Sequence, residues 1–267
     1  MRVWLALISA FILTACTDSN WVLVDDFERP GAMTAWARLD VDNQTDPFIS
    51  DPQISEIKSA NGNRFMLRKP AADGVVGNRK AIGRRDLPRP IEIGEVATLY
   101  LRFNVERFPN NHSFGLTNQT ASAIEELGYD AFEPMFRITD KAESDGTKND
   151  GTLMVLTGEK TYSKIINPAT GQSAKPLESG LWYEMWGVIN NAASEDDGQT
   201  YDLYLRGGEF AEVTQVFTGA KFRIGRGEPL TGFVAISNTG PKRAPYGNGG
   251  VRYDDIYLAS GTVLTTP

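Results

Sequence analysis

Apolar and polar residues alternate along much of this chain, which is the pattern of β-strands that turn one face toward a core. In the run 97–105, the apolar residues Leu99, Leu101 and Phe103 occupy every second position, so one face of this strand should be buried and the other exposed. This pattern predicts an all-β protein, a sandwich or a barrel. Strand-like runs separated by turn signals occur at 21–27, 64–67, 97–105, 113–116, 135–138, 152–157, 182–190, 200–206, 213–217, 232–237 and 251–259.

The segments between these runs carry turn and helix signals. The triplets NDG at 149–151 and DDG at 196–198 predict hairpin turns, because aspartate and glycine tolerate a positive φ. One short helix is predicted over 121–127, with Thr120 as its N-cap and Gly128 as its C-cap.

Three motifs resemble the concanavalin A-like (laminin G-like) jelly rolls. The chain reads WYEMW at 182–186, YDLYLRGG at 201–208 and YDDIYL at 253–258, which look like a hairpin and the last strand of those domains. The resemblance implies an antiparallel β-sandwich whose first and last strands lie together in one sheet. The sequence contains no internal repeat and no linker, so we expect a single jelly-roll domain over residues 21–267.

The first residues have the pattern of an export signal. Arg2 precedes an apolar run at 3–13, which is too short to span a membrane. The run ends in LTAC at 13–16, which resembles the lipobox of bacterial lipoproteins. The resemblance implies a signal peptide over 1–15, a lipid on Cys16 and a tether over 16–20; an ordinary secretory signal is the alternative.

The residue that follows the cysteine bears on the destination of the protein. By the same resemblance, Thr17 stands where inner-membrane lipoproteins carry aspartate, so we expect the bacterial outer membrane, on its periplasmic or cell-surface side. Acyl chains would hold the protein on that membrane.

Composition excludes several classes of site. The only histidine is His112, which rules out multi-histidine zinc sites. The only cysteine is Cys16, so a lipid on it leaves no cysteine for a disulfide or a thiolate site. The net charge of −7 argues against nucleic acid as a partner, and we expect a monomer. The segment 64–89 nevertheless carries eight basic and two acidic residues. It could contact a polyanionic glycan, or its charges could pair with the acidic remainder.

Neither of the two best-known catalytic patterns of the jelly-roll enzymes is present. The E-x-D-x-E motif of laminarinase-like glycosidases and the Q-x-H motif of alginate-lyase-like enzymes are both missing. A lyase of another pattern remains open, with His112 or Tyr100 as the base and Arg102 as the group that neutralises a substrate carboxylate. Tyr100 and Arg102 share the exposed face of one predicted strand, which suits a shared site. A solvated pair of side chains without a catalytic role would show the same pattern.

The strand that begins at Trp182 is the best candidate for a binding site. Trp182, Glu184 and Trp186 share one of its faces. Two indole rings and a carboxylate could stack on sugar rings and accept hydrogen bonds from hydroxyl groups. The alternative is that one or both tryptophans pack in the core.

Paired acids lie near both ends of the domain. Asp25 and Asp26 belong to the first strand, and Asp254 and Asp255 belong to the last, where alternation points them to opposite faces. The jelly-roll resemblance implies a structural calcium held by an aspartate of the last strand and oxygens near the first. Surface acids at strand ends are the alternative.

These observations together favour a membrane-anchored lipoprotein that binds carbohydrate without cleaving it. The alternatives are a polysaccharide lyase or glycoside hydrolase with a non-standard active site, and a structural envelope lipoprotein that binds another protein.

Overall fold

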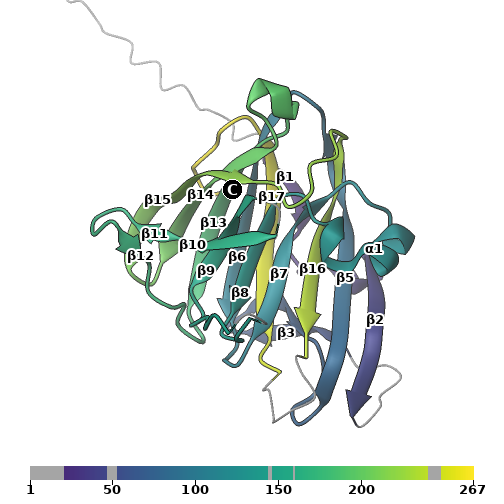
Figure 1. The fold of residues 1–267 in the computed structure, drawn as a ribbon. Coiled ribbons are helices and arrows are strands. Elements are labelled where there is room, and N and C mark those ends of the chain that lie inside the picture. Colours follow the sequence, from purple (N-terminus) through teal and green to yellow (C-terminus); the bar gives the residue numbers. More distant parts are fainter. Residues whose placement is uncertain (1–20, 47–52, 144–145, 159, 240–247) are drawn as a thin grey trace, which may run out of the picture.

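The structure is a computed structural model of the chain. It shows two antiparallel sheets packed face to face, with a short ribbon of β11 (Ile166–Asn167) and β12 (Gln172–Ser173) near β15 (Figure 1). The described part contains no helix long and apolar enough to cross a membrane. The predicted signal peptide and Cys16 lie outside the described residues, which are 21–46, 53–143, 146–158, 160–239 and 248–267.

The first sheet has eight strands among the described residues. Its order is β15 (Phe210–Lys221), β14 (Thr200–Gly207), β13 (Trp182–Asn190), β6 (Val96–Val105), β17 (Val251–Ser260), β4 (Asn63–Lys69) and β3 (Ile54–Ala60). The remaining strand, β1 (Val22–Asp25), pairs with β17 through Val22 opposite Leu258. The expectation that the first and last strands lie together in one sheet is therefore confirmed.

The second sheet has seven strands in the described part of the chain. Its order is β10 (Thr161–Lys164), β9 (Leu153–Gly158), β8 (Met135–Thr139), β7 (Asn111–Thr117), β16 (Leu230–Asn238), β5 (Val76–Ile91) and β2 (Trp36–Asp46).

The main core lies between the two sheets. Leu99, Leu101 and Phe103 of β6 are fully buried there, as their alternation predicts. The ring of Phe103 lies 5.8 Å from that of Phe114 on the opposite sheet, so aromatic side chains join the two layers.

One helix covers part of the outer face of the seven-stranded sheet. Helix α1 (Ala121–Leu127) has the predicted bounds, and the hydroxyl of Thr120 caps it by accepting a hydrogen bond from the amide of Ala123. The 3₁₀ turn η2 (Gly128–Ala131) follows it directly (Figure 1). A second apolar cluster forms beneath these elements: Ile82, Ile124, Ala131, Phe132, Met135, Leu156, Val234 and Ile236. Two further 3₁₀ turns are η1 (Ala32–Ala35) and η3 (Ser194–Asp196).

The outer face of the eight-stranded sheet is also partly covered, by the segment that follows β17. The hydroxyl of Thr98 donates to the carbonyl of Gly261 at 2.7 Å and accepts from the amide of Val263 at 3.0 Å. Farther along, the carbonyl of Thr265 accepts a hydrogen bond from the indole of Trp186 at 3.0 Å. This segment thus crosses from β6 to β13 and buries side chains that alternation alone places in solvent.

Candidate functional site: a charge-balanced hollow

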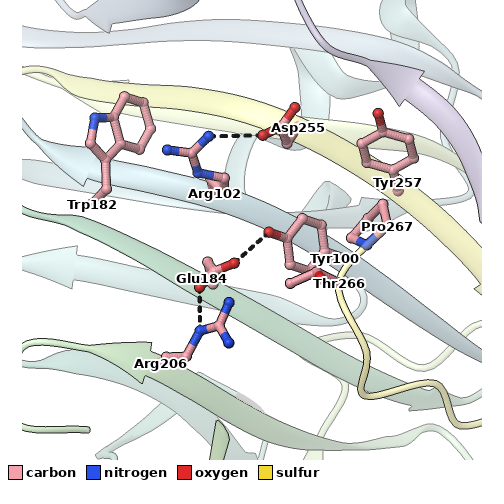
Figure 2. Close-up of a pocket in the computed structure, with 9 residues that line it drawn as sticks. All are labelled: Tyr100, Arg102, Trp182, Glu184, Arg206, Asp255, Tyr257, Thr266 and Pro267. Carbon is pink, nitrogen blue, oxygen red and sulfur yellow. Dashed lines mark hydrogen bonds and ion pairs between the residues drawn. The ribbon is translucent and has the colours of Figure 1, made fainter. Parts of the chain in front are cut away.

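A hollow of about 500 Å³ lies on the outer face of the eight-stranded sheet, beside the chain's last residues. Four neighbouring strands contribute its polar and aromatic side chains, and the last two residues form one wall (Figure 2). The lining residues are Tyr100 and Arg102 of β6, Trp182 and Glu184 of β13, Arg206 of β14, Asp255 and Tyr257 of β17, and Thr266 and Pro267.

Opposite charges face each other across this hollow from strand to strand. The register places Glu184 directly between Arg206 of β14 and Arg102 of β6. Glu184 accepts a hydrogen bond from Arg206, and Arg102 forms an ion pair with Asp255 at 2.9 Å (Figure 2). Cross-strand pairs of opposite charge stabilise a sheet. The four lining side chains of this row, which we call the charge ladder, together carry no net charge.

A β-bulge in β17 completes the charge ladder. The pairing of β17 with β6 gains one residue between Asp254 and Tyr257, and Asp255 takes a left-handed φ of 48°. Both acids consequently approach Arg102, at 3.5 Å for Asp254 and 2.9 Å for Asp255. The prediction that these two carboxylates point to opposite faces is wrong, because the bulge interrupts the alternation.

The hydroxyl of Tyr100 is a fixed donor in this hollow. It donates to Glu184 at 2.9 Å. Burial, together with the nearby charge of Glu184, raises the pKa of Tyr100 far above its ordinary value, so it stays protonated. Burial also favours a higher pKa for Glu184, but the hydrogen bonds from Arg206 and Tyr100 outweigh it and lower that pKa. Glu184 is therefore an ionised acceptor near neutral pH.

The two tryptophans of β13 differ in exposure. Trp182 is half-buried at the edge of the hollow, and the guanidinium of Arg102 lies 5.0 Å from the centre of its ring. Trp186 points to the same side of the sheet but is 0% exposed, because it lies against Tyr100 and donates to Thr265. The prediction that Trp186 offers an exposed ring to a sugar is therefore contradicted, whereas Trp182 keeps the position that the prediction requires.

The residues considered for a lyase do not come together in one site. Tyr100 and Arg102 line the hollow, but His112 lies on β7 in the other sheet and is 0% exposed. Burial and the neighbouring Arg68 lower the pKa of His112 to about 3. Tyr100 is also unsuitable as a base because its proton is held, so the predicted set of His112, Tyr100 and Arg102 has no shared catalytic centre.

The terminal acids do not fit a calcium site. Asp25 is buried and accepts hydrogen bonds from the indole of Trp36 at 2.9 Å and the amide of Phe27 at 3.1 Å, with Arg85 at 3.5 Å. Asp26 accepts instead from the backbone amide of Glu28.

The acids of β17 are engaged as well. Asp254 accepts from Asn63 at 2.8 Å, and both Asp254 and Asp255 pair with Arg102. Within the described residues, no three His, Cys, Asp or Glu side chains gather as metal ligands. The predicted calcium cluster of Asp25, Asp26, Asp254 and Asp255 is therefore not supported, because protein donors already occupy these oxygens.

The basic segment 64–89 does not form an open anion site. Three of its cations pair with acids outside the segment, as the paired alternative predicted, a fourth pairs with Asp86 inside it, and Arg68 is fully buried. The pairs are Lys69 with Glu106, Arg84 with Asp86, Arg85 with Asp25 and Arg89 with Glu95.

Sequence reasoning missed three parts of the hollow. Arg206 lies in the quoted YDLYLRGG motif, but its place opposite Glu184 follows from the strand register, which the sequence does not reveal. Tyr257 lies two residues after Asp255 in β17, so strand alternation places the two side chains on one face, and this pattern could have identified Tyr257. Thr266 and Pro267 carry no signal of their own, because only the path of the last segment brings them here.

Solved structures resemble the whole of this fold. The globular domain of calreticulin from T. cruzi superposes with a TM-score of 0.51, at 12% identity, over 90% of this chain and 89% of its own. The fold is a concanavalin A-like β-sandwich. The VIP36 exoplasmic/lumenal domain (TM-score 0.48, 9% identity, 88% and 87% coverage) and peanut lectin (0.47, 9%, 86% and 99%) are further matches. No family model and no curated protein matches the sequence of this chain.

Proposed function

We propose that this protein binds a neutral saccharide in the hollow of the eight-stranded sheet. The observation that carries the proposal is the half-buried ring of Trp182 beside a charge ladder without net charge. Sugars have an apolar face that stacks on aromatic rings and hydroxyl groups that both donate and accept hydrogen bonds. Arg102 and Arg206 supply donors, and Glu184 and Asp255 supply acceptors.

The same geometry favours binding over cleavage. A glycosidase needs a carboxylic acid that remains protonated until it protonates the leaving oxygen. The pKa of Glu184 is lowered, so this group is ionised. Burial raises the pKa of Asp254 to about 6, but its side chain is 1% exposed and therefore out of reach of a ligand.

The binding test compares variants of two aromatic residues on the same face. Trp182→Ala should abolish binding of neutral oligosaccharides that the wild type captures on a glycan array, while Trp182→Phe should retain part of it. Tyr204→Ala is the matched control, because Tyr204 also lies on the outer face of this sheet but does not line the hollow. Equal binding by wild type and Trp182→Ala, or cleavage of a bound oligosaccharide, would contradict the proposal.

We also propose that the sandwich is held at the bacterial outer membrane by a lipid on Cys16. The support is the lipobox-like segment LTAC at 13–16. Cys16→Ser should release the protein from the membrane fraction, because acyl chains buried in a bilayer supply the anchoring free energy. Mass spectrometry of the wild type should show added acyl groups. Wild-type protein that carries no acyl group and is recovered entirely in the soluble fraction would contradict the proposal.

A further inference from the structure

The outer face of the seven-stranded sheet carries a groove on the opposite side of the sandwich from the hollow. Two adjoining depressions of about 230 and 510 Å³ form it, and they share Glu143, Lys160 and Tyr162. We call this surface the basic groove. Its residues come from β7, β8, β9, β10 and β16, from η2, from described residues of the loop between β8 and β9, and from Lys160 and Arg223.

Positive charge dominates the basic groove, although the whole chain has a net charge of −7. Glu143 is the one acid among its lining residues within the described chain. Six cations line it: Arg137, Lys141, Lys148, Lys160, Lys164 and Arg223.

Four of these cations are held by acids, and one of them is Lys160, which lies 3.4 Å from Asp130. Arg137 forms an ion pair with Glu143 at 2.6 Å, Arg223 pairs with Asp130 at 2.8 Å, and Lys164 pairs with Asp150 at 2.6 Å. These pairs fix the walls of the groove but leave the total charge positive.

Tyr162, which lines both depressions, holds Arg137 and Arg223 in place. The guanidinium of Arg137 lies 4.6 Å from the centre of the Tyr162 ring, and Arg223 donates to the Tyr162 hydroxyl at 3.0 Å. Arg137 and Arg223 are each less than a tenth exposed, so these donors are packed into the protein. Ordered guanidinium groups recognise carboxylate and sulfate with little loss of conformational entropy.

Two lysines of the basic groove form no ion pair with any acid of the described residues. Neither Lys141 nor Lys148 has a carboxylate within ion-pair distance among the residues that the structure describes. Burial and the charge of Arg137 lower the pKa of Lys141. An anion that enters beside Lys141 would offset both effects, so this lysine gains more from a negative ligand than a solvated surface lysine does.

We propose that the basic groove is a second binding site and that its ligand is an acidic polysaccharide. Lys141 lines one depression and Lys148 the other, so a polymer with a negative charge on successive units can reach both lysines. A single small anion can fill only one depression. The acidic remainder of the protein repels nucleic acid at longer range, which favours a polysaccharide of lower charge density.

The test uses polygalacturonate and its fully methyl-esterified form, which keeps the backbone but removes the charge. The wild-type protein should bind polygalacturonate by calorimetry, more weakly at higher salt, and much more tightly than the ester, which can bind only at the hollow proposed for neutral saccharides. The Lys141→Gln/Lys148→Gln double variant should lose at least about tenfold in affinity. Dextran sulfate in parallel separates sulfate from carboxylate recognition, and loss of either interaction in the double variant supports the site.

Two matched variants complete the test. Lys221→Gln removes an exposed lysine of β15 on the other sheet and should bind like the wild type. Trp182→Ala should also keep polygalacturonate binding, so failure of the first proposal is distinguishable from failure of this one. Unchanged affinity in the double variant, equal binding of the methyl ester, or tighter binding of single-stranded DNA at the same salt would overturn the inference.

Discussion

The two outer faces of this sandwich handle charge in opposite ways. In the hollow, strand register sets each arginine against a carboxylate, so Arg206, Glu184, Arg102 and Asp255 cancel one another. In the basic groove, Arg137 and Arg223 are paired, but Lys141 and Lys148 form no ion pair in the described part of the chain. Both faces contain an aromatic ring in contact with an arginine.

The difference shows how one fold can offer two kinds of sugar site. Aromatic rings and guanidinium groups suit saccharides in general. The balance of the remaining charges then decides whether a neutral or an acidic saccharide is preferred.

The largest effect should come from Trp186, which lies beneath the hollow. Trp186→Ala should lower the free energy of unfolding by about 3–5 kcal/mol, because it removes a fully buried indole and its bond to Thr265. Trp182→Ala, at the edge of the same hollow, should cost much less. Urea denaturation of both variants checks this contrast, and equal losses would contradict the assignment of Trp186 to packing.

A pH-dependent effect should follow from His112, which lies in the interior between the two faces. The unfolded chain binds a proton at His112 below a pKa of about 6.5, but the folded chain does so only near its lowered pKa of about 3. Acid therefore favours unfolding between these values, at about 1.4 kcal/mol per pH unit.

His112→Gln removes this contribution. The variant should consequently lose less stability than the wild type as the pH falls from 7 to 4, which denaturation midpoints across that range measure. Parallel pH profiles for the two proteins would show that His112 does not titrate in this way.

A smaller effect should follow when one rung of the charge ladder is neutralised. Glu184→Gln keeps an acceptor for Tyr100 but gives the hollow one positive charge. Because the Arg206–Glu184 pair is partly exposed, the variant should lose only roughly 1 kcal/mol of stability. In the Lys141→Gln/Lys148→Gln background, this change should restore weak polygalacturonate binding. No gain by calorimetry would mean that charge balance does not set the preference of the hollow.

Much of the fold could be predicted from local patterns. The alternation in β6, the helix Ala121–Leu127 with its caps, and the pairing of the terminal strands all follow from residues close in sequence or from the jelly-roll motifs. The shared face of Trp182, Glu184 and Trp186 followed from the same two-residue period.

The rest depended on contacts between distant segments. Burial of Trp186 is caused by Thr265, 79 residues away, and the convergence of Asp254 and Asp255 is caused by a bulge that interrupts the alternation. The basic groove had no contiguous signal either. Its cations lie near 137–164 and at 223, whereas four of the eight cations in the conspicuous basic run at 64–89 are paired with acids.

The most direct measurement of the central claim is a crossed titration of two variants with two ligands. Trp182→Ala and Lys141→Gln/Lys148→Gln are each titrated with a neutral oligosaccharide captured by the wild type and with polygalacturonate. We expect the tryptophan variant to lose only the neutral ligand and the lysine variant to lose only the acidic one. Loss of both ligands in a single variant, or of neither in both variants, would contradict two separate sites on the two faces.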